Sequence, residues 1–260
     1  MTPNSALAEL RKTAPLVHNI ANYVSMNIAA NVALAAGASP AMLHAEEEVA
    51  DFAAIAGALT INIGTLSTPW VRAMHLAADA ANDAGKPWVL DPVAHFATPY
   101  RGSVAKELVT KRPAIIRGNA SEILALSGQT GSGKGADSGD SVASAEGAAM
   151  ELAKDTGAVV VITGEVDFVT DGNRVARVSG GSSLMPQVTA LGCSLTVLMG
   201  AYAAICPAFD AAVSALLHFA QAGSDAAKTA NGPGSFSVAF LDALANIQPG
   251  ELDETQIAWN

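Results

Sequence analysis

Polar side chains stand at the ends of several short apolar runs in this sequence. Asp91, Arg117 and Thr163 each close or directly follow such a run. Ligands of open α/β sheets bind at the carboxyl ends of the strands, so these positions are candidates for a binding site. A carboxylate such as Asp91 is costly to bury unless it meets a cation, a metal ion or a helix cap. A plain cap or turn residue is the alternative, and Asp91 alone does not decide between the two.

A second carboxylate lies in the segment Arg-Gly-Asn-Ala-Ser-Glu that begins at Arg117. Asn119 and Glu122 have the spacing of a capping box, in which both side chains bond backbone N–H groups at a helix start. That interpretation requires no function. The functional alternative gives Asn119 and Glu122 a share in the ligand shell of Mg²⁺, and gives Arg117 a forked contact to nucleotide phosphate.

Backbone amides offer anion contacts at two further places. Thr163 and Gly164 follow a predicted strand, where their amides can approach a phosphate. Gly192 and Cys193 precede a long run of small residues that predicts a helix, and the N–H groups at a helix start attract anions. Thiol pKa values tend to fall at a helix start, although most free cysteines are buried and inert.

A glycine-rich stretch occupies residues 128–140 and contains Gly-Gln-Thr-Gly-Ser-Gly-Lys-Gly. It matches the phosphate-binding loop pattern G-x-x-x-x-G-K, but Gly135 stands where Ser or Thr would bind Mg²⁺. The known loop also follows a strand directly, whereas this stretch follows a helical pattern. A flexible surface loop is the simpler interpretation, and a lid near a phosphate is a third.

The elements that must position these residues alternate along the chain. Short, apolar and mostly β-branched runs predict buried strands at residues 39–43, 58–63, 87–92, 113–117 and 158–162. Helical patterns lie between them, at residues 22–36, 46–57, 68–85, 100–111, 119–127 and 141–157. This alternation predicts a three-layer α/β/α fold with a mostly parallel central sheet and helices on both faces.

The pattern changes after residue 162. Residues 166–170 and 174–178 flank an Asp-Gly turn, which is a strong signal for a β-hairpin. Helices are predicted next, at residues 192–206, 209–229 and 234–245, and the polar tail is expected to be irregular. Neither a repeat nor a linker divides the chain, so we expect one domain over residues 1–260.

Composition narrows the class of protein. The 260 residues carry a net charge of −10, with 50% hydrophobic and 15% charged residues. This excludes a disordered chain, and the acidic balance argues against a nucleic-acid partner. The apolar runs are too short to cross a membrane and no signal peptide is recognisable, so we expect a cytoplasmic protein. On one helix, Cys193 and Cys206 would be about 20 Å apart, too far for a disulfide.

The ordered motifs together resemble the hydroxyethylthiazole kinase family of ribokinase-like kinases. The resemblance runs over nearly the whole chain, from residues 17–22 to residues 232–236. Its most specific parts are residues 22–26, 37–42, 63–66, 90–93 and 117–122, and residues 133–138 match the family's loop. So many matches in one order argue against chance, and against the phosphate-binding loop.

The resemblance implies phosphorylation of the hydroxyl of 4-methyl-5-(2-hydroxyethyl)thiazole by ATP and Mg²⁺, in thiamine biosynthesis or salvage. By motif position, Asp91 and Glu122 would help to hold Mg²⁺, directly or through water. Arg117 and Thr163 would contact ATP, and Met42 would line the thiazole site. Family members are typically trimers with this site between neighbouring subunits. A homotrimer would account for the sparse surface charge.

The predicted helix start at residues 190–194 would complete the site. The resemblance implies that Ala190 contacts the substrate through its backbone, and that Cys193 takes the place where most ribokinase-like enzymes have a catalytic Asp. The amides of Leu191, Gly192, Cys193 and Ser194 would bind the transferring phosphoryl group as charge develops.

Three residues depart from the family's pattern. Ala190 and Leu191 replace the Gly and Thr of the usual Thr-Gly-Thr-Gly-Cys, and Ala21 stands where a Thr is common. Ala190 cannot adopt a glycine-only conformation cheaply, and Leu191 removes a hydroxyl near the phosphate. Two alternatives therefore stay open: a kinase of another small heterocyclic alcohol, and a thiazole or nucleotide binder that has lost catalysis.

Overall fold

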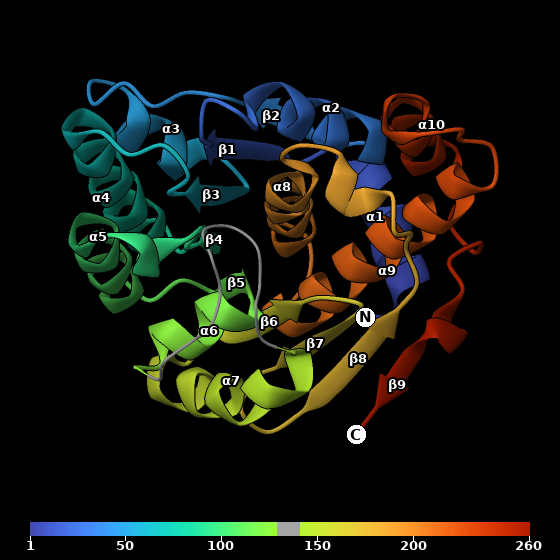
Figure 1. Cartoon of the computed structure of the whole chain (residues 1–260). Helices are drawn as coiled ribbons and strands as arrows, with labels where there is room; N and C mark the ends of the chain where they lie inside the picture. The colour runs from blue at the N-terminus through green and yellow to red at the C-terminus, as the bar shows by residue number, and fades with distance from the viewer. Residues whose placement is uncertain (129–140) are drawn as a thin grey trace.

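A single nine-stranded sheet organises the computed structural model, which describes residues 1–128 and 141–260. The order across the sheet is β2-β1-β3-β4-β5-β6-β7-β8-β9 (Figure 1). The strands are β1 (Leu16–Ile20), β2 (Ser39–Ala41), β3 (Ala58–Asn62), β4 (Trp88–Asp91), β5 (Ile115–Asn119), β6 (Val159–Thr163), β7 (Val166–Thr170), β8 (Val175–Ser179) and β9 (Ile257–Trp259).

The sheet has a parallel part and an antiparallel part. Neighbours from β2 to β6 pair in parallel, and neighbours from β6 to β9 pair antiparallel. Parallel strands need crossover connections, and helices supply them here. As a result, the carboxyl ends of β2, β1, β3, β4, β5 and β6 all lie along one edge of the sheet.

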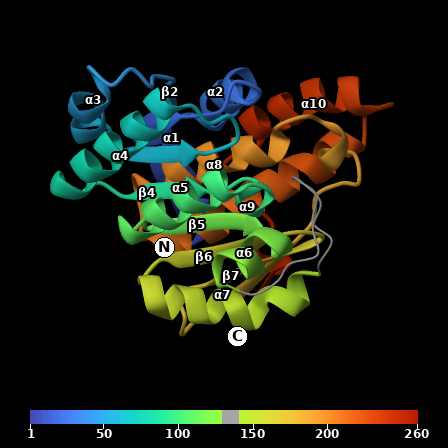
Figure 2. The same cartoon turned by 60° about the vertical axis from the view of Figure 1, so that its left-hand side comes forward.

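Helices cover both faces of the sheet (Figure 1 and Figure 2). One face carries α1 (Pro3–Thr13), α2 (Met26–Ala36), α8 (Leu191–Ala203), α9 (Ala208–Ala227) and α10 (Pro233–Asn246). The other carries α3 (Val49–Ile55), α4 (Thr68–Asp83), α5 (Pro99–Thr110), α6 (Ala120–Leu126) and α7 (Val142–Thr156). Short 3₁₀ helices are η1 (His95–Ala97), η2 (Met185–Gln187) and η3 (Glu254–Gln256). The predicted three-layer α/β/α fold is confirmed.

The helix α8 lies directly on the central strands. Thr196, in its second turn, contacts Asp91 at the carboxyl end of β4. One turn later, a side chain at Gly200 would collide with the methyl group of Thr60 on β3, so the glycine permits this close approach. The helix therefore runs from the carboxyl edge of the sheet back across it, and its N-terminus points into the edge where ligands bind.

Most elements predicted from the sequence are present with shifts of a few residues at their ends. The predicted hairpin is β7–β8, and Gly157 ends α7 in a left-handed conformation as a helix-stop glycine should. Two elements near the N-terminus, α1 and β1, were not predicted. The tail is not wholly irregular, because Ile257 pairs with Val178 and adds β9 to the sheet.

Other expectations concern segments outside this core. No helix among the described residues combines the length and apolarity needed to cross a bilayer. Cys193 and Cys206 are both free thiols, as expected. Of the glycine-rich stretch, residues 129–140 lie outside the described residues, and with them the loop patterns predicted there.

Candidate active site

The parallel edge of the sheet brings most of the predicted site residues into one row. Asp91 ends β4, Arg117 lies near the end of β5, and Thr163 ends β6. Met42 follows β2, at the edge of the sheet. Because β2 and β4 are separated by two other strands, their ends are about 14 Å apart. The row is long enough for two ligands placed end to end.

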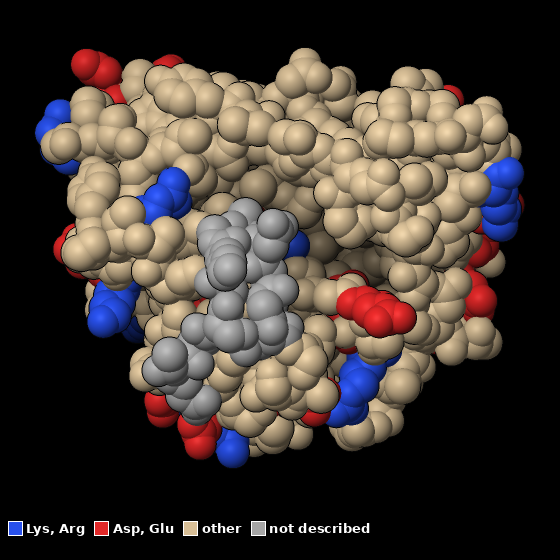
Figure 3. All heavy atoms as spheres, in the orientation of Figure 1, with Lys and Arg blue, Asp and Glu red and all other residues tan. Residues whose placement is uncertain are grey.

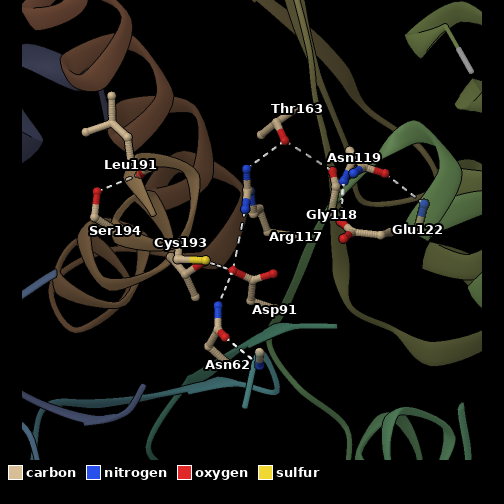
Figure 4. A network of polar contacts seen from close by, with 12 residues as sticks. Asn62, Asp91, Arg117, Gly118, Asn119, Glu122, Thr163, Leu191, Cys193 and Ser194 are labelled. Atoms are coloured by element: carbon tan, nitrogen blue, oxygen red, sulfur yellow. Dashed lines mark hydrogen bonds and ion pairs between the residues drawn. The ribbon is translucent and has the colours of Figure 1, made fainter. Parts of the chain in front are cut away.

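The carboxylate of Asp91 is buried and bonded on one side (Figure 4). Its Oδ2 accepts hydrogen bonds from Asn62 Nδ2 at 2.7 Å and from Thr196 Oγ1 at 2.8 Å. Arg117 Nη1 lies 3.4 Å from the same oxygen as an ion pair. Oδ1, also buried, has no hydrogen-bond partner. Burial raises the pKa of Asp91, and the charge of Arg117 and the donors oppose that rise.

The guanidinium of Arg117 joins the ends of two further elements. Its Nη2 donates to Thr163 Oγ1 at 2.8 Å, so the two residues predicted to contact ATP also contact each other. A Cβ added to Gly192, at the start of α8, would lie 3.3 Å from Nη2. Arg117 is thus placed between Asp91 and the helix start, where a phosphate can meet both a positive charge and helix amides.

Glu122 forms the capping box predicted from its spacing. Asn119 Oδ1 accepts from the amide of Glu122 at 2.9 Å, and Glu122 Oε2 accepts from the amide of Asn119 at 2.8 Å. The amide of Ala94, after β4, donates to Oε1 at 2.8 Å. Burial, followed by the charge of Asp91, raises the pKa of Glu122 to about 7. The cap and a role beside Asp91 are therefore compatible.

These two carboxylates suit a magnesium ion. Asp91 Oδ1 is an unpartnered acceptor, and Figure 4 shows it on the side of Asp91 that faces Glu122. No group of three or more His, Cys, Asp or Glu that could hold a metal occurs within residues 1–128 and 141–260. Mg²⁺ is commonly held by one or two carboxylates together with waters and substrate phosphates, so a closed protein cage is not needed.

Only some of the backbone amides at the start of α8 are available to bind an anion. The amide of Leu191 donates to the carbonyl oxygen of Val188 at 3.3 Å, and the amide of Ser194 makes a helical bond at 3.0 Å. Ser194 Oγ donates back to the carbonyl oxygen of Leu191 at 2.6 Å. Among the described residues, the amides of Gly192 and Cys193 have no acceptor in the structure. Of the four predicted amides, these two are free to bind a phosphoryl oxygen.

Ala190 adopts the left-handed conformation, with φ 62° and ψ 10°, immediately before α8. Glycine visits this region freely, whereas a residue with a Cβ pays about 1–2 kcal/mol. Ala190 therefore adopts, at a cost in strain, a backbone conformation that glycine adopts freely.

The thiol of Cys193 does not have the lowered pKa that a helix start can produce. Burial, followed by the negative charge of Asp91, raises its pKa to about 11. Asn22 Nδ2 donates to Sγ at 3.6 Å. The thiol consequently keeps its proton near pH 7, and it is not present as the thiolate that could act as a base.

The end of the row near Met42 is lined by aromatic rings. The rings of His44 and Tyr23 pack on that of Trp70, with centroids 4.4 Å and 4.6 Å away. His18 Nε2 lies 3.0 Å from the carbonyl oxygen of Leu43, which fixes the chain beside Met42. This end is apolar and aromatic, in contrast to the charged end near Arg117.

Comparison with known proteins identifies the family of this chain. A family model described as the hydroxyethylthiazole kinase family matches residues 7–250. The chain belongs to this family. A hydroxyethylthiazole kinase from Roseobacter denitrificans is 67% identical over 252 residues, covering 97% of this chain and 98% of the relative.

Solved structures agree with this assignment. The structure of a hydroxyethylthiazole kinase from Pyrococcus horikoshii has 39% identity and a TM-score of 0.92, and the match covers 99% of this chain and 98% of the other. A ribokinase-like superfamily protein from Enterococcus faecalis shares the fold, with 12% identity, a TM-score of 0.67 and 95% of both chains covered. The resemblance inferred from the motifs, its ribokinase-like fold and its kinase activity are confirmed.

Sequence reasoning missed three polar residues of this kinase's site. Asn22 donates to Cys193, and Asn62 donates to Asp91. Thr196 also donates to Asp91. Asn62 stands at the end of a predicted strand, which is the signal that pointed to Asp91. Thr196 carries no such signal, because a threonine inside a helix that is apolar all round looks like any other core residue.

Proposed function

We propose that the chain transfers the terminal phosphoryl group of ATP to the hydroxyl of 4-methyl-5-(2-hydroxyethyl)thiazole, giving its monophosphate in thiamine biosynthesis or salvage. The observation that carries this proposal is the position of Arg117, between the carboxylate of Asp91 and the start of α8. Phosphoryl transfer depends mainly on positioning and on charge neutralisation, and this arrangement offers both.

The charged end of the row is the proposed site of the ATP phosphates. Arg117 provides a fixed positive charge, and Thr163 holds its guanidinium in place through the 2.8 Å hydrogen bond. The amides of Gly192 and Cys193 point from the helix start and stabilise negative charge on the transferring group. A chain with a net charge of −10 needs such local compensation to bind a polyphosphate.

Asp91 and Glu122 are the proposed ligands of Mg²⁺, directly or through water. When bound, Mg²⁺ supplies neutralisation of charge on the polyphosphate. Asp91 presents Oδ1 for this purpose, because its Oδ2 is already bonded to three groups. Glu122 is held by two backbone amides, which fix the direction of its carboxylate.

The aromatic end of the row is the proposed site of the thiazole ring, with Met42 in its lining. Ala190 offers its backbone to the substrate, and Cys193 lies where the acceptor hydroxyl must approach the phosphoryl group. With a pKa of about 11, the Cys193 thiol holds its proton and contributes contact and polarity to the acceptor hydroxyl. A loose transition state tolerates this, since the alcohol proton can leave late.

The decisive experiment is an assay with hydroxyethylthiazole, ATP and Mg²⁺ that measures the phosphorylated thiazole. Parallel assays with other small heterocyclic alcohols, read by ADP release, test whether another acceptor is preferred. The strain at Ala190 motivates the alternative of a binder without catalysis. Heat of thiazole binding by calorimetry without any turnover would establish that alternative.

We further propose that the kinase works as a cytoplasmic homotrimer, with the thiazole site at a boundary between subunits. Large apolar side chains stand exposed beside the aromatic end: Tyr23 is 70% exposed and Val24 is 59% exposed. The upper middle part of the face shown in Figure 3 carries few charged side chains, so a neighbour can cover it at little desolvation cost. Light scattering on a sizing column tests the trimer, and a charge at Val24 should weaken it.

A further inference from the structure

The carboxylate of Asp91 is asymmetric in its contacts. Oδ2 accepts from the side chains of Asn62, Thr196 and Arg117, at 2.7, 2.8 and 3.4 Å. Oδ1 of the same group is equally buried and has no partner. A buried acceptor is normally satisfied, so an empty one beside a crowded one requires a reason.

The direction of the Asn62 amide is fixed by its other neighbours. Its Oδ1 accepts from the Asn22 amide at 2.7 Å and from the Gly64 backbone at 2.8 Å, so its Nδ2 must point to Asp91. Asn22 is fixed in turn, because its Oδ1 accepts from the amides of Val24 and Ser25, both at 3.0 Å. A directed chain of donors therefore runs from the turn before α2 to Asp91.

A close contact between Gly64 and Asn22 supports this series of hydrogen bonds. A Cβ on Gly64 would lie 2.5 Å from Asn22 Nδ2 and 2.9 Å from its Cβ, so the glycine leaves the space that Asn22 occupies. Thr196 donates to the same oxygen of Asp91 from another element, the helix α8. The three elements β3, β4 and α8 thus fix the carboxylate from two directions.

We infer that Asn62 and Thr196 are positioning residues that occupy Asp91 Oδ2 and leave Oδ1 as the single oxygen presented to the divalent cation or its bound water. The inference rests on the proposed function only where it names a divalent cation as the partner of Oδ1. Outer contacts that orient a ligating carboxylate commonly change metal affinity 10–100-fold when removed.

The test uses a pair of matched threonines. Thr196→Val removes the hydroxyl that donates to Asp91. Thr60→Val removes an equally buried hydroxyl that donates to Asn19 Oδ1 at 2.6 Å, on the neighbouring strand and away from Asp91. The readout is Mn²⁺ binding in the presence of ADP, followed by the electron paramagnetic resonance signal of free Mn²⁺.

We expect Thr196→Val to weaken Mn²⁺ binding about tenfold. Thr60→Val should stay within about twofold of wild type. Thr196→Ser keeps the hydroxyl, so its Mn²⁺ affinity should be close to that of wild type. Equal effects of the two valine variants, or unchanged Mn²⁺ affinity in Thr196→Val, would overturn the inference. Should Thr196→Val fail to fold, Gly64→Ala takes its place, with Gly147→Ala as control because a Cβ there meets open space. Gly64→Ala should displace Asn22 and so weaken Mn²⁺ binding. Unchanged Mn²⁺ affinity in this variant would contradict the inference.

The inference and the proposed function fail separately. If wild type phosphorylates the thiazole while both valine variants bind Mn²⁺ alike, the inference alone is wrong. If wild type does not phosphorylate the thiazole while Thr196→Val still loses Mn²⁺ affinity, the inference stands and the assigned substrate is wrong.

Discussion

Gly192 lies against the guanidinium of Arg117, so closely that a Cβ at this glycine would be 3.3 Å from Nη2. Two elements far apart in the sequence, the end of β5 and the start of α8, meet at this contact. The proposed phosphate site depends on both, since one supplies a charge and the other supplies amides. The residue type at position 192 therefore determines how closely Arg117 can approach the start of α8.

Gly192→Ala should lower kcat about tenfold, because the added methyl group pushes either Arg117 or the helix start a few tenths of an ångström out of position. The loss should appear at saturating ATP and thiazole in steady-state assays. Gly147→Ala, within α7, is the matched control and should retain full activity, since nothing lies within 4 Å of its added Cβ. Equal activities in the two variants would contradict this prediction.

Cys193→Ala should leave measurable kinase activity, whereas Glu122→Ala should cost far more. The thiol is neutral, with a pKa of about 11, so its removal takes away contact rather than a base. Glu122 is a buried carboxylate and a proposed ligand of the metal ion. Steady-state kcat/KM for both variants decides the order, and a greater loss in Cys193→Ala would show that the thiol acts as a catalytic base.

Ala190→Gly should change catalysis, whereas Ala14→Gly should not. Both alanines have left-handed backbones, with φ 62° and φ 44°, but Ala14 ends α1 and lies away from the site. Relief of strain and the greater freedom of the unfolded glycine chain oppose each other, so each change in unfolding free energy should be within about 1 kcal/mol. The KM for the thiazole alcohol should shift in Ala190→Gly alone. Urea unfolding and steady-state kinetics check both halves of the prediction.

His218 is buried as a neutral ring, so its contribution to stability should fall as the pH falls from 7 to 5. Its Nδ1 faces Tyr202 Oη at 3.0 Å and its Nε2 faces the carbonyl oxygen of Leu244 at 3.1 Å. Burial lowers its pKa from 6.5 to about 4, so the unfolded chain binds a proton in this range and the folded chain does not. Linkage then assigns to His218 a loss of about 2 kcal/mol between pH 7 and pH 5. Glu122 and Asp167 act in the opposite direction, because burial raises the pKa of each to about 7.

Urea unfolding of wild type and His218→Gln at the two pH values isolates the contribution of His218. His218→Gln should be less stable than wild type at pH 7, and this difference should shrink by pH 5. If the free energy of unfolding of His218→Gln changed with pH as that of wild type does, the prediction for His218 would be wrong.

Local patterns in the sequence determined the alternating elements and the ends of several of them. The capping box of Asn119 and Glu122 and the hairpin at Gly172 form as their spacing predicts, because caps and turns depend on residues a few positions apart. Parallel strands place their carboxyl ends on one edge, so Asp91, Arg117 and Thr163 were expected near one another before any contact was known. The family motifs then gave these residues their expected roles.

Tertiary structure decided which atoms meet. The bond from Thr196 to Asp91 joins residues 105 positions apart, and it exists because Gly200 lets α8 lie close to the sheet. The high pKa of the Cys193 thiol likewise comes from its burial and from the charge of Asp91, which outweigh the helix start that the sequence revealed. Desolvation and long-range packing depend on the assembled core, so sequence spacing alone could not determine them.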